Sequence, residues 1–304
     1  MEARDREEQD HPRQLNADSS HGASPVSFAD GIPATATHAP RDSGVPFDAR
    51  DMSVKDRVVI ISGAGQGIGR ELARQFAAAG ARVVVADVNA ANADRVQNEI
   101  ARADGDAMAA TVDIGNEESL EAMVSTVLAK YGRTDVLING AAIFATLRKR
   151  PFDQIPLDEW NRVLHVNITG TFLSVRAVLP AMRAAKWGRI INISSNSVRK
   201  GVPNYLHYVT SKSAIIGMTN AMARELGADG ITVNCIRPGA VATEVERAVN
   251  PTIERRIAQV AEQCIPRGMV PPDLVGLAMF LSTPAASFMT GQTIACDGGM
   301  THSS

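Results

Sequence analysis

The sequence predicts a single doubly wound α/β domain, in which a seven-stranded parallel sheet carries helices on both faces. From Lys55 onward, short β-branched runs alternate with longer patterns of helical period. Such alternation is typical of βαβ units, whose parallel strands are buried on both faces. A glycine-dense turn follows the first apolar run, and no segment repeats in tandem. One domain over residues 53–304 is therefore the economical solution.

The individual elements follow from these patterns. The expected strands are the apolar runs at residues 58–61, 82–87, 107–112, 135–139, 189–194, 231–236 and 292–297. The expected helices run from the glycine turn to Gly80, over 90–103, from the Asn116 cap to Tyr131, and over 157–182, 205–226 and 272–282. Pro238 and Gly239 are expected to break the sixth strand, and the stretch from there to about Pro266 is expected to be mobile.

Composition excludes several classes of function. The chain has 304 residues, of which 45% are hydrophobic and 21% charged, and its net charge of -2 gives no reason to expect nucleic acid or an anionic membrane as partner. No run approaches the length of a membrane span. The three cysteines, Cys235, Cys264 and Cys296, are far apart and lack metal-binding spacing. Reduced thiols in a cytoplasmic protein without a metal site are the expectation.

The first 52 residues differ from the rest of the chain. They contain five prolines, few large apolar side chains and more acid than base. Such a segment cannot bury enough apolar surface to offset the entropy lost on ordering, so residues 1–52 are expected to form a disordered tail. A mitochondrial transit peptide, which would be poor in acidic residues, is the minority interpretation.

The glycine-dense turn lies between the first strand and the first helix and has the spacing G-x-x-x-G-x-G at Gly63, Gly67 and Gly69. Glycines allow a sharp turn and a close approach to a diphosphate, which the free N–H groups of the helix start would face. No Gly-Lys-Ser/Thr follows, which excludes a Walker A loop. The alternative at this point is a tight turn without a ligand.

Asp87 ends the second strand, 24 residues after Gly63. In a doubly wound fold, an acid at this place accepts hydrogen bonds from the adenosine ribose hydroxyls and would repel the 2′-phosphate of NADP. Neither the turn nor the residues just after Asp87 supply an Arg or Lys for that phosphate, so NAD is favoured. The alternative is a solvated acid at a strand end.

Tyr208 and Lys212 are spaced i, i+4 on a predicted helix and therefore share one face. A cation near a phenol favours the phenolate and makes the tyrosine a better base. Taken alone, such a pair is more often a packing tyrosine beside a surface lysine.

Several ordered motifs, taken together, make the chain resemble the short-chain dehydrogenases/reductases from Lys55 to the end. The motifs are Ser62–Gly69, Asp87, Asp113-Ile114, Asn139-Gly140-Ala141-Ala142, Val166-Asn167-Ile168, Ile193-Ser194-Ser195, Tyr208 with Lys212, Arg237-Pro238-Gly239 with Thr243, and Asp297-Gly298-Gly299. The resemblance implies a Rossmann fold and an NAD-dependent oxidoreductase that interconverts a secondary alcohol and a ketone. Gly140 and Ala142 depart from the usual Asn-Asn-Ala-Gly, which puts the rigidity of that turn in doubt.

The resemblance also implies a catalytic tetrad. Ser195 would hydrogen-bond the substrate oxygen, with Ser194 as a nearby structural rival, and Tyr208 would exchange the proton of the alcohol. Lys212 would bind the nicotinamide ribose and lower the pKa of Tyr208. Asn167 would lie at a bend in its helix and hold a water for proton relay.

The same resemblance assigns the cofactor contacts. They would come from Gly63, Gln66, Gly67, Ile68, Gly69, Asp87, Asp113, Ile114, Asn139, Ala141, Tyr208, Lys212, Pro238, Gly239, Val241 and Thr243. Helices around 157–182 and 205–226 would pack against a neighbour in a homotetramer or homodimer.

Segments 196–205 and 241–265 should wall the substrate pocket, and their Val, Ala, Ile and Tyr content suggests a neutral, partly apolar substrate. Short segments such as residues 187–192 resemble the sequences of family members that act on aryl or cyclic secondary alcohols. The basic run from Leu147 to Arg150 is interpreted as a solvated loop tip, with an acidic-substrate clamp as the alternative. His165 and His207 are interpreted as structural.

Two other functions remain as alternatives. One is an NADPH-dependent 3-oxoacyl-type ketoreductase, against which Asp87 argues. The other is a nucleotide-sensing protein without turnover, against which the complete set of Asn167, Ser195, Tyr208 and Lys212 argues.

Overall fold

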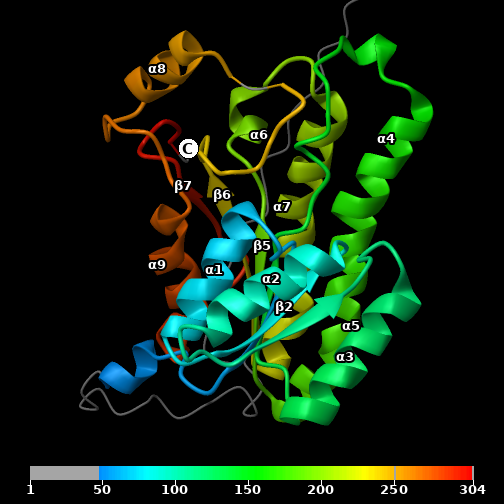
Figure 1. Ribbon diagram of the computed structural model, residues 1–304, viewed down its shortest axis with the longest axis vertical. Helices are drawn as coiled ribbons and strands as arrows, with labels where there is room; N and C mark the ends of the chain where they lie inside the picture. Colours follow the sequence, from blue (N-terminus) through cyan, green and yellow to red (C-terminus); the bar gives the residue numbers. More distant parts are fainter. Residues whose placement is uncertain (1–47, 250, 303–304) are drawn as a thin grey trace, which may run out of the picture. The chain divides into compact units, whose positions relative to one another are not determined.

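The computed structural model describes residues 48–249 and 251–302, which form a doubly wound α/β domain (Figure 1). Seven parallel strands lie in the order β3-β2-β1-β4-β5-β6-β7. The strands are β1 (Val58–Ser62), β2 (Arg82–Asp87), β3 (Ala107–Thr111), β4 (Val136–Asn139), β5 (Gly188–Ile193), β6 (Ile231–Pro238) and β7 (Thr293–Cys296). Register follows the β-branched runs, with Ile60 opposite both Val84 and Leu137. The predicted fold class is confirmed.

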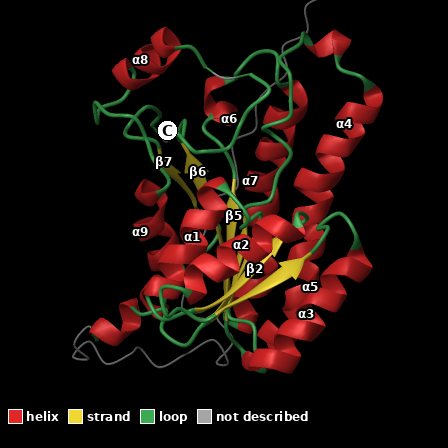
Figure 2. Cartoon of the chain, in the orientation of Figure 1, coloured by secondary structure: helices red, strands yellow, loops and turns green. Residues whose placement is uncertain are grey.

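Helices cover both faces of this sheet (Figure 2). One face is covered by α1 (Gly67–Ala78), α2 (Ala90–Ala101) and α9 (Pro272–Leu281), and the other by α3 (Glu117–Tyr131), α5 (Gly170–Ala185) and α7 (Leu206–Leu226). The remaining helices are α4 (Leu157–Leu164), the short α6 (Ser197–Lys200) and α8 (Ile253–Ala261). Phe76 and Leu72 fill the first layer and Met182 and Leu120 the second. The burial of these apolar side chains is the main contribution to stability.

Most element boundaries agree with the predicted ones, and the bounds of β2 are identical. The Asn116 side chain accepts a hydrogen bond from the Ser119 N–H at 2.8 Å, as expected of an N-cap. Gly80 ends the first helix with a φ of 84°, a conformation that favours glycine. α3 ends at Gly132, also in a left-handed conformation.

Three expectations need correction. β6 includes Pro238, whose missing N–H is tolerated in the last residue of a strand. The stretch expected to be mobile contains α8, capped by the Thr252 side chain on the Arg255 N–H. Residues 49–52, assigned to the tail, form a 3₁₀ helix, while the part of the predicted tail at residues 1–47 lies outside the described residues.

The long helical segment Leu157–Ala185 contains one π-turn at His165–Thr169 between α4 and α5. By length and apolar composition alone this segment is long enough to cross a membrane. In this fold Val175, Val178 and Met182 pack into the second core layer, as in a helix that covers a sheet.

Candidate functional site

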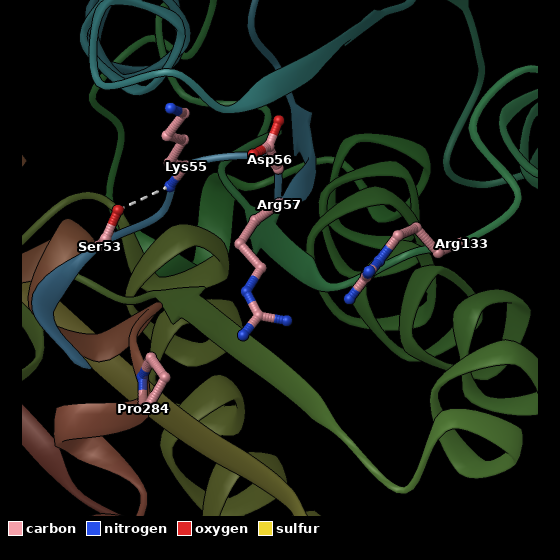
Figure 3. Close-up of a pocket in the computed structure, with 6 residues that line it drawn as sticks. All are labelled: Ser53, Lys55, Asp56, Arg57, Arg133 and Pro284. Carbon is pink, nitrogen blue, oxygen red and sulfur yellow. Dashed lines mark hydrogen bonds between the residues drawn. The ribbon is translucent and has the colours of Figure 1, made fainter. Parts of the chain in front are cut away.

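The predicted site residues gather where the parallel strands end. α6 follows β5, and the chain leading to α8 follows β6, so both emerge at the same end of the sheet (Figure 1). Carboxyl ends of strands in an open α/β sheet form the ligand-binding crevice. A separate hollow of about 390 Å³ lies near the amino ends of β1 and β4, around Arg57 and Arg133 (Figure 3). Both guanidinium groups pair with the buried Asp135.

The glycine turn is shaped for a close backbone approach. Gly63 and Gly67 have φ of 70° and 57°, which favour glycine. A Cβ on Gly69 would lie 2.2 Å from the Gly63 carbonyl oxygen, so helix and strand touch through backbone atoms. Gln66 precedes the first turn of α1 without capping it, and the side chain of Ile68 packs against the core. This geometry fits a diphosphate at the start of α1.

Asp87 lies beside this turn as predicted. Its Oδ2 accepts a hydrogen bond from the Gly65 N–H at 2.9 Å, and its Oδ1 accepts one from the Asn89 N–H at 2.9 Å. A carboxylate has about four acceptor positions, so it can still bind ribose hydroxyls. The structure also places a cation here that was not predicted from the sequence. Arg95, which lies one turn into α2, donates a hydrogen bond from its Nη2 to the Gly65 carbonyl oxygen at 2.8 Å.

The predicted diphosphate position already holds a carboxylate of this chain. Glu244 Oε1 accepts a hydrogen bond from the Gly67 N–H at 3.0 Å and lies 3.6 Å from Nη1 of Arg70. A Cβ on Gly67 would also come within 3.1 Å of the Val245 side chain. The segment after β6 therefore closes over the glycine turn. No local pattern indicates this contact, which joins residues 177 positions apart.

Tyr208 and Ser195 meet above the end of β5. Tyr208 is buried on α7, and that burial raises the pKa of its phenol to about 12. A hydrogen bond with Ser195 and the positive charge of Arg247 act in the opposite direction. Ser195 Oγ also accepts a hydrogen bond from the Ser197 N–H at 3.2 Å, which holds the serine at the start of α6.

Lys212 lies on the same face of α7 as Tyr208, with its Nζ 6.0 Å from the ring centroid. The ammonium donates to the Ile193 carbonyl oxygen at 2.8 Å, and burial lowers the pKa of Lys212 to about 8. Ser195 and Arg247 lower the pKa of Tyr208, and the lowering by Lys212 stays a prediction. Ser194 donates to the Lys212 carbonyl oxygen at 2.7 Å, a structural role as expected.

Asn167 lies in the π-turn, the bend that was expected for it. π-turns inside α-helices occur frequently at functional sites. Its Oδ1 accepts a hydrogen bond from the Ile143 N–H at 2.8 Å, and its Nδ2 donates to Ser211 Oγ at 3.0 Å. Asn167 therefore ties the segment after β4 to α7, one residue before Lys212.

The predicted cofactor contacts after β3 and β4 differ in their surroundings. Asp113 is exposed after β3 and accepts a hydrogen bond from the Gly115 N–H, while the Ile114 side chain is buried against Gly170. The Asn139 side chain donates a hydrogen bond to Asn192 Oδ1 inside the sheet. Ala141 approaches the turn, since a Cβ on Gly63 would meet its Cα at 2.8 Å.

The residues after β6 line the same crevice. The Pro238 carbonyl oxygen accepts from the Asn196 N–H at 2.9 Å, and Gly239 donates to the Cys296 carbonyl oxygen at 3.0 Å. Val241 forms a β-bridge with Met269, and Thr243 Oγ1 accepts from the Val245 N–H at 3.4 Å.

The basic run after β4 is not a solvated tip, which corrects that expectation. Leu147 is buried, and Arg150 lies 3.6 Å from Glu159. Lys149 Nζ lies 6.0 Å from the ring centroid of Tyr205. Only Arg148 is exposed as expected.

An aromatic cluster of Phe144, Tyr205 and Tyr208 forms beneath this run and was missed by sequence reasoning. The Phe144 ring centroid is 4.5 Å from that of Tyr208 and 5.9 Å from that of Tyr205. Arg247 lies 5.3 Å from the Phe144 centroid and donates to the Val241 carbonyl oxygen. Phe144 follows the Asn-Gly-Ala-Ala turn by two residues, and that position is the only signal the sequence offers.

Both histidines have structural contacts. His207 is fully buried, with its Nε2 3.3 Å from Glu159, and His165 Nε2 lies 3.0 Å from the Gly115 carbonyl oxygen. Trp187 and Arg189 lie at the amino end of β5. The segment 187–192 therefore begins at the end of the strand opposite the crevice. Among residues 48–249 and 251–302, no group of three or more His, Cys, Asp or Glu side chains is placed to hold a metal ion.

Three features of this site are typical of a dinucleotide-dependent oxidoreductase: a glycine-rich strand-to-helix turn, an acid after the second strand, and a Ser-Tyr-Lys set. A family model described as enoyl-(acyl carrier protein) reductase matches residues 63–301. A 3-oxoacyl-[acyl-carrier-protein] reductase of Synechocystis sp. is 37% identical over 248 residues, covering 80% of this chain and 96% of that protein. A 7alpha-hydroxysteroid dehydrogenase of Escherichia coli strain K12 is 36% identical over 254 residues, covering 83% of this chain and 97% of that protein.

Solved structures agree. A 7alpha-hydroxysteroid dehydrogenase complexed with NADH and 7-oxo glycochenodeoxycholic acid is similar with a TM-score of 0.78 and 35% identity, covering 84% of this chain and 98% of that one. A putative gluconate 5-dehydrogenase from Beutenbergia cavernae with bound NADP is similar with a TM-score of 0.76 and 35% identity. The match covers 82% of this chain and 98% of that one. The chain belongs to the short-chain dehydrogenase/reductase family and is an oxidoreductase acting on CH–OH groups.

Proposed function

We propose that this enzyme transfers hydride between NAD(H) and a secondary alcohol or ketone, using Ser195, Tyr208, Lys212 and Asn167. The observation that carries the proposal is the meeting of Ser195 and Tyr208 beside Lys212 at the carboxyl ends of the strands. The cradle at Gly63 and Gly69, which a Cβ would fill, fits a dinucleotide diphosphate. NAD(H), when bound, supplies the hydride donor or acceptor.

In this proposal the side chains handle the proton while the hydride moves. Tyr208 Oη gives a proton to the ketone oxygen in reduction and takes one from the alcohol in oxidation. A phenol with a pKa of about 12 is protonated at neutral pH and is thus a competent donor. Ser195 orients the substrate oxygen toward Tyr208. Asn167 fixes the helix bend and, through Ser211, the position of α7 around Lys212.

NAD is proposed over NADP because Asp87 lies beside the glycine turn, where its charge would repel a 2′-phosphate. Arg95 at the Gly65 carbonyl is the feature that favours the alternative, an NADPH-dependent 3-oxoacyl-type ketoreductase. Arg95 also pairs with Glu99 at 3.3 Å, which offsets part of its charge. A sensor without turnover is the remaining alternative, and it predicts nucleotide binding without hydride transfer.

The proposed substrate carries its alcohol on an aryl or cyclic carbon framework. Phe144 and Tyr205 stand next to Tyr208 and offer flat apolar surfaces that suit such a framework. Three free thiols, at Cys235, Cys264 and Cys296, are consistent with the cytoplasmic location that we propose. A homodimer or homotetramer through α4–α5 and α7 is proposed from the exposed apolar side chains of Phe172 and Leu206.

The test is a panel of cyclic and aryl secondary alcohols and ketones assayed with NAD(H) and NADP(H) at the nicotinamide absorbance. The proposal expects turnover with a preference for NAD(H). A preference for NADP(H) would overturn the cofactor assignment, and NADH binding without turnover across the panel would favour the sensor.

A further inference from the structure

We propose that the substrate carries an anionic group, which is bound by Arg247, Lys149 and Arg255 beside the aromatic cluster of Phe144, Tyr205 and Tyr208. This inference rests on the proposed function and names the class of substrate that its site takes. It also revises the expectation of a neutral substrate. The acidic-substrate clamp, the alternative interpretation of the basic run after β4, is thereby favoured for Lys149.

Three cations converge on the aromatic cluster from three segments. Arg247, after β6, lies 5.3 Å from the Phe144 ring centroid. Lys149, after β4, lies 6.0 Å from the Tyr205 ring centroid. Arg255 comes from α8, and its charge acts on both Tyr205 and Lys149. The charges of Arg247 and Arg255 both lower the pKa of Tyr205.

These cations have no acidic counterpart among residues 48–249 and 251–302, where no ion pair within 4.0 Å involves any of them. The acids of the same segment are directed elsewhere. Glu244 contacts Gly67 and Arg70, and the Glu254 carboxylate is hydrogen-bonded at the start of α8, by its own N–H and by Thr252. Glu246 is exposed and has no ion pair in the described part of the chain.

Like charges placed together without a counterion repel one another, and partial burial strengthens that repulsion. Lys149 shows the effect, because burial and then the charge of Arg255 lower the pKa of its ammonium. A substrate carboxylate, sulfonate or phosphate would relieve this repulsion and accept charge-assisted hydrogen bonds. The reacting oxygen would lie at Tyr208 and the anion across the ring face of Phe144.

The geometry also relates the anion to the reacting carbon. Phe144 contacts both groups, since its ring centroid lies 4.5 Å from that of Tyr208 and 5.3 Å from the Arg247 guanidinium carbon. An aryl or cyclic ketone with an acid group on its framework fits this arrangement.

The experiment compares 4-acetylbenzoate and 3-acetylbenzoate with their methyl esters, which keep size and ring but lack the charge. Reduction by NADH is measured as kcat/KM at low and high ionic strength. We expect at least one carboxylate to exceed its ester by roughly tenfold, the magnitude of one charge-assisted contact. The preference should shrink as salt is added.

Variants of two of the cations, Arg247 and Lys149, separate their charge from general effects. Arg247→Gln and Lys149→Gln should each lower the carboxylate-to-ester ratio of kcat/KM through a higher KM for the carboxylate. Comparing ratios removes any common change in kcat that follows from the effect of Arg247 on Tyr208. Arg148→Gln is the matched control, since Arg148 is exposed in the same loop, and its ratio should equal that of the wild type.

Two failures are distinguishable. Turnover of esters and carboxylates with equal kcat/KM, or a ratio that the Arg247 and Lys149 variants leave unchanged, would overturn the anionic-substrate proposal and leave the oxidoreductase proposal intact. No turnover of any ketone with either cofactor, in a protein that binds NADH, would overturn the proposed function and this inference with it.

Discussion

Replacing Glu244 by Gln should tighten the binding of NADH. In the structure the Glu244 carboxylate accepts the Gly67 N–H at 3.0 Å and lies 3.6 Å from Arg70. These contacts occupy an N–H group and a cation at the start of α1, where a dinucleotide diphosphate is expected to bind. The carboxylate must leave before the diphosphate can bind, and the departed charge still repels the ligand.

The expected size follows from these contacts. The Glu244 side chain is 49% exposed, so its pairing with Arg70 is screened and contributes at most ~1 kcal/mol. A carboxylate at a helix N-terminus contributes about 0.3–1 kcal/mol more than a neutral group. Glutamine keeps a carbonyl oxygen for Gly67 but loses both charge effects. A net gain of about 1 kcal/mol corresponds to a dissociation constant that is roughly fivefold lower.

The assay is titration of the enzyme with NADH in the absence of substrate, by calorimetry or nicotinamide fluorescence. Glu246→Gln removes one charge from the same segment without a contact at Gly67 and serves as the matched control. The difference between the two variants should fall as salt rises. Equal affinities for both variants, or weaker binding by Glu244→Gln, would refute the competition between Glu244 and the diphosphate.

Three further predictions follow from the site. Asp87→Asn should raise the NADPH-to-NADH ratio of kcat/KM at least tenfold, because the repulsive carboxylate is lost while Arg95 remains at the Gly65 carbonyl; an unchanged ratio would remove Asp87 from cofactor selection. Arg247→Gln should move the rise of alcohol oxidation to higher pH, because Arg247 lowers the pKa of Tyr208 and its loss raises that pKa; a pH profile of kcat for a neutral alcohol measures this, and a shift to lower pH would contradict it. Phe172→Glu should convert the assembly toward a 32.3 kDa monomer in light scattering, since Phe172 is an exposed aromatic residue on α5; an unchanged mass would move the interface elsewhere.

The sheet and most of its helices could be predicted because buried parallel strands require continuous apolar runs. Arg82–Asp87 is such a run, and its predicted bounds match β2. The helix α8 was missed because its apolar residues, Ile253 and Ile257, are largely exposed, and the stretch after Pro238 and Gly239 was interpreted as mobile. The Thr252 cap and the i, i+4 spacing were the available signals.

The positions of the candidate site residues on strand ends and one helix face could also be predicted, since they depend on local periodicity. Contacts between distant loops could not. Glu244 at Gly67 and Arg247 at Phe144 depend on how the segment after β6 folds back over the sheet. Lys149 was predicted to be solvated because a basic run in a loop usually is, and only the structure places it beside Tyr205.

The most direct test of the proposed function is Tyr208→Phe, which removes one oxygen atom and keeps the ring that packs on Phe144. Tyr131→Phe is the matched control, because that phenol contacts Asp106 on the far edge of the domain. With an active ketone from the panel, Tyr208→Phe should lose at least a hundredfold in kcat, the contribution of a positioned general acid, while NADH affinity stays within about twofold. Retention of near wild-type kcat by Tyr208→Phe would contradict the assignment of Tyr208 as the proton donor.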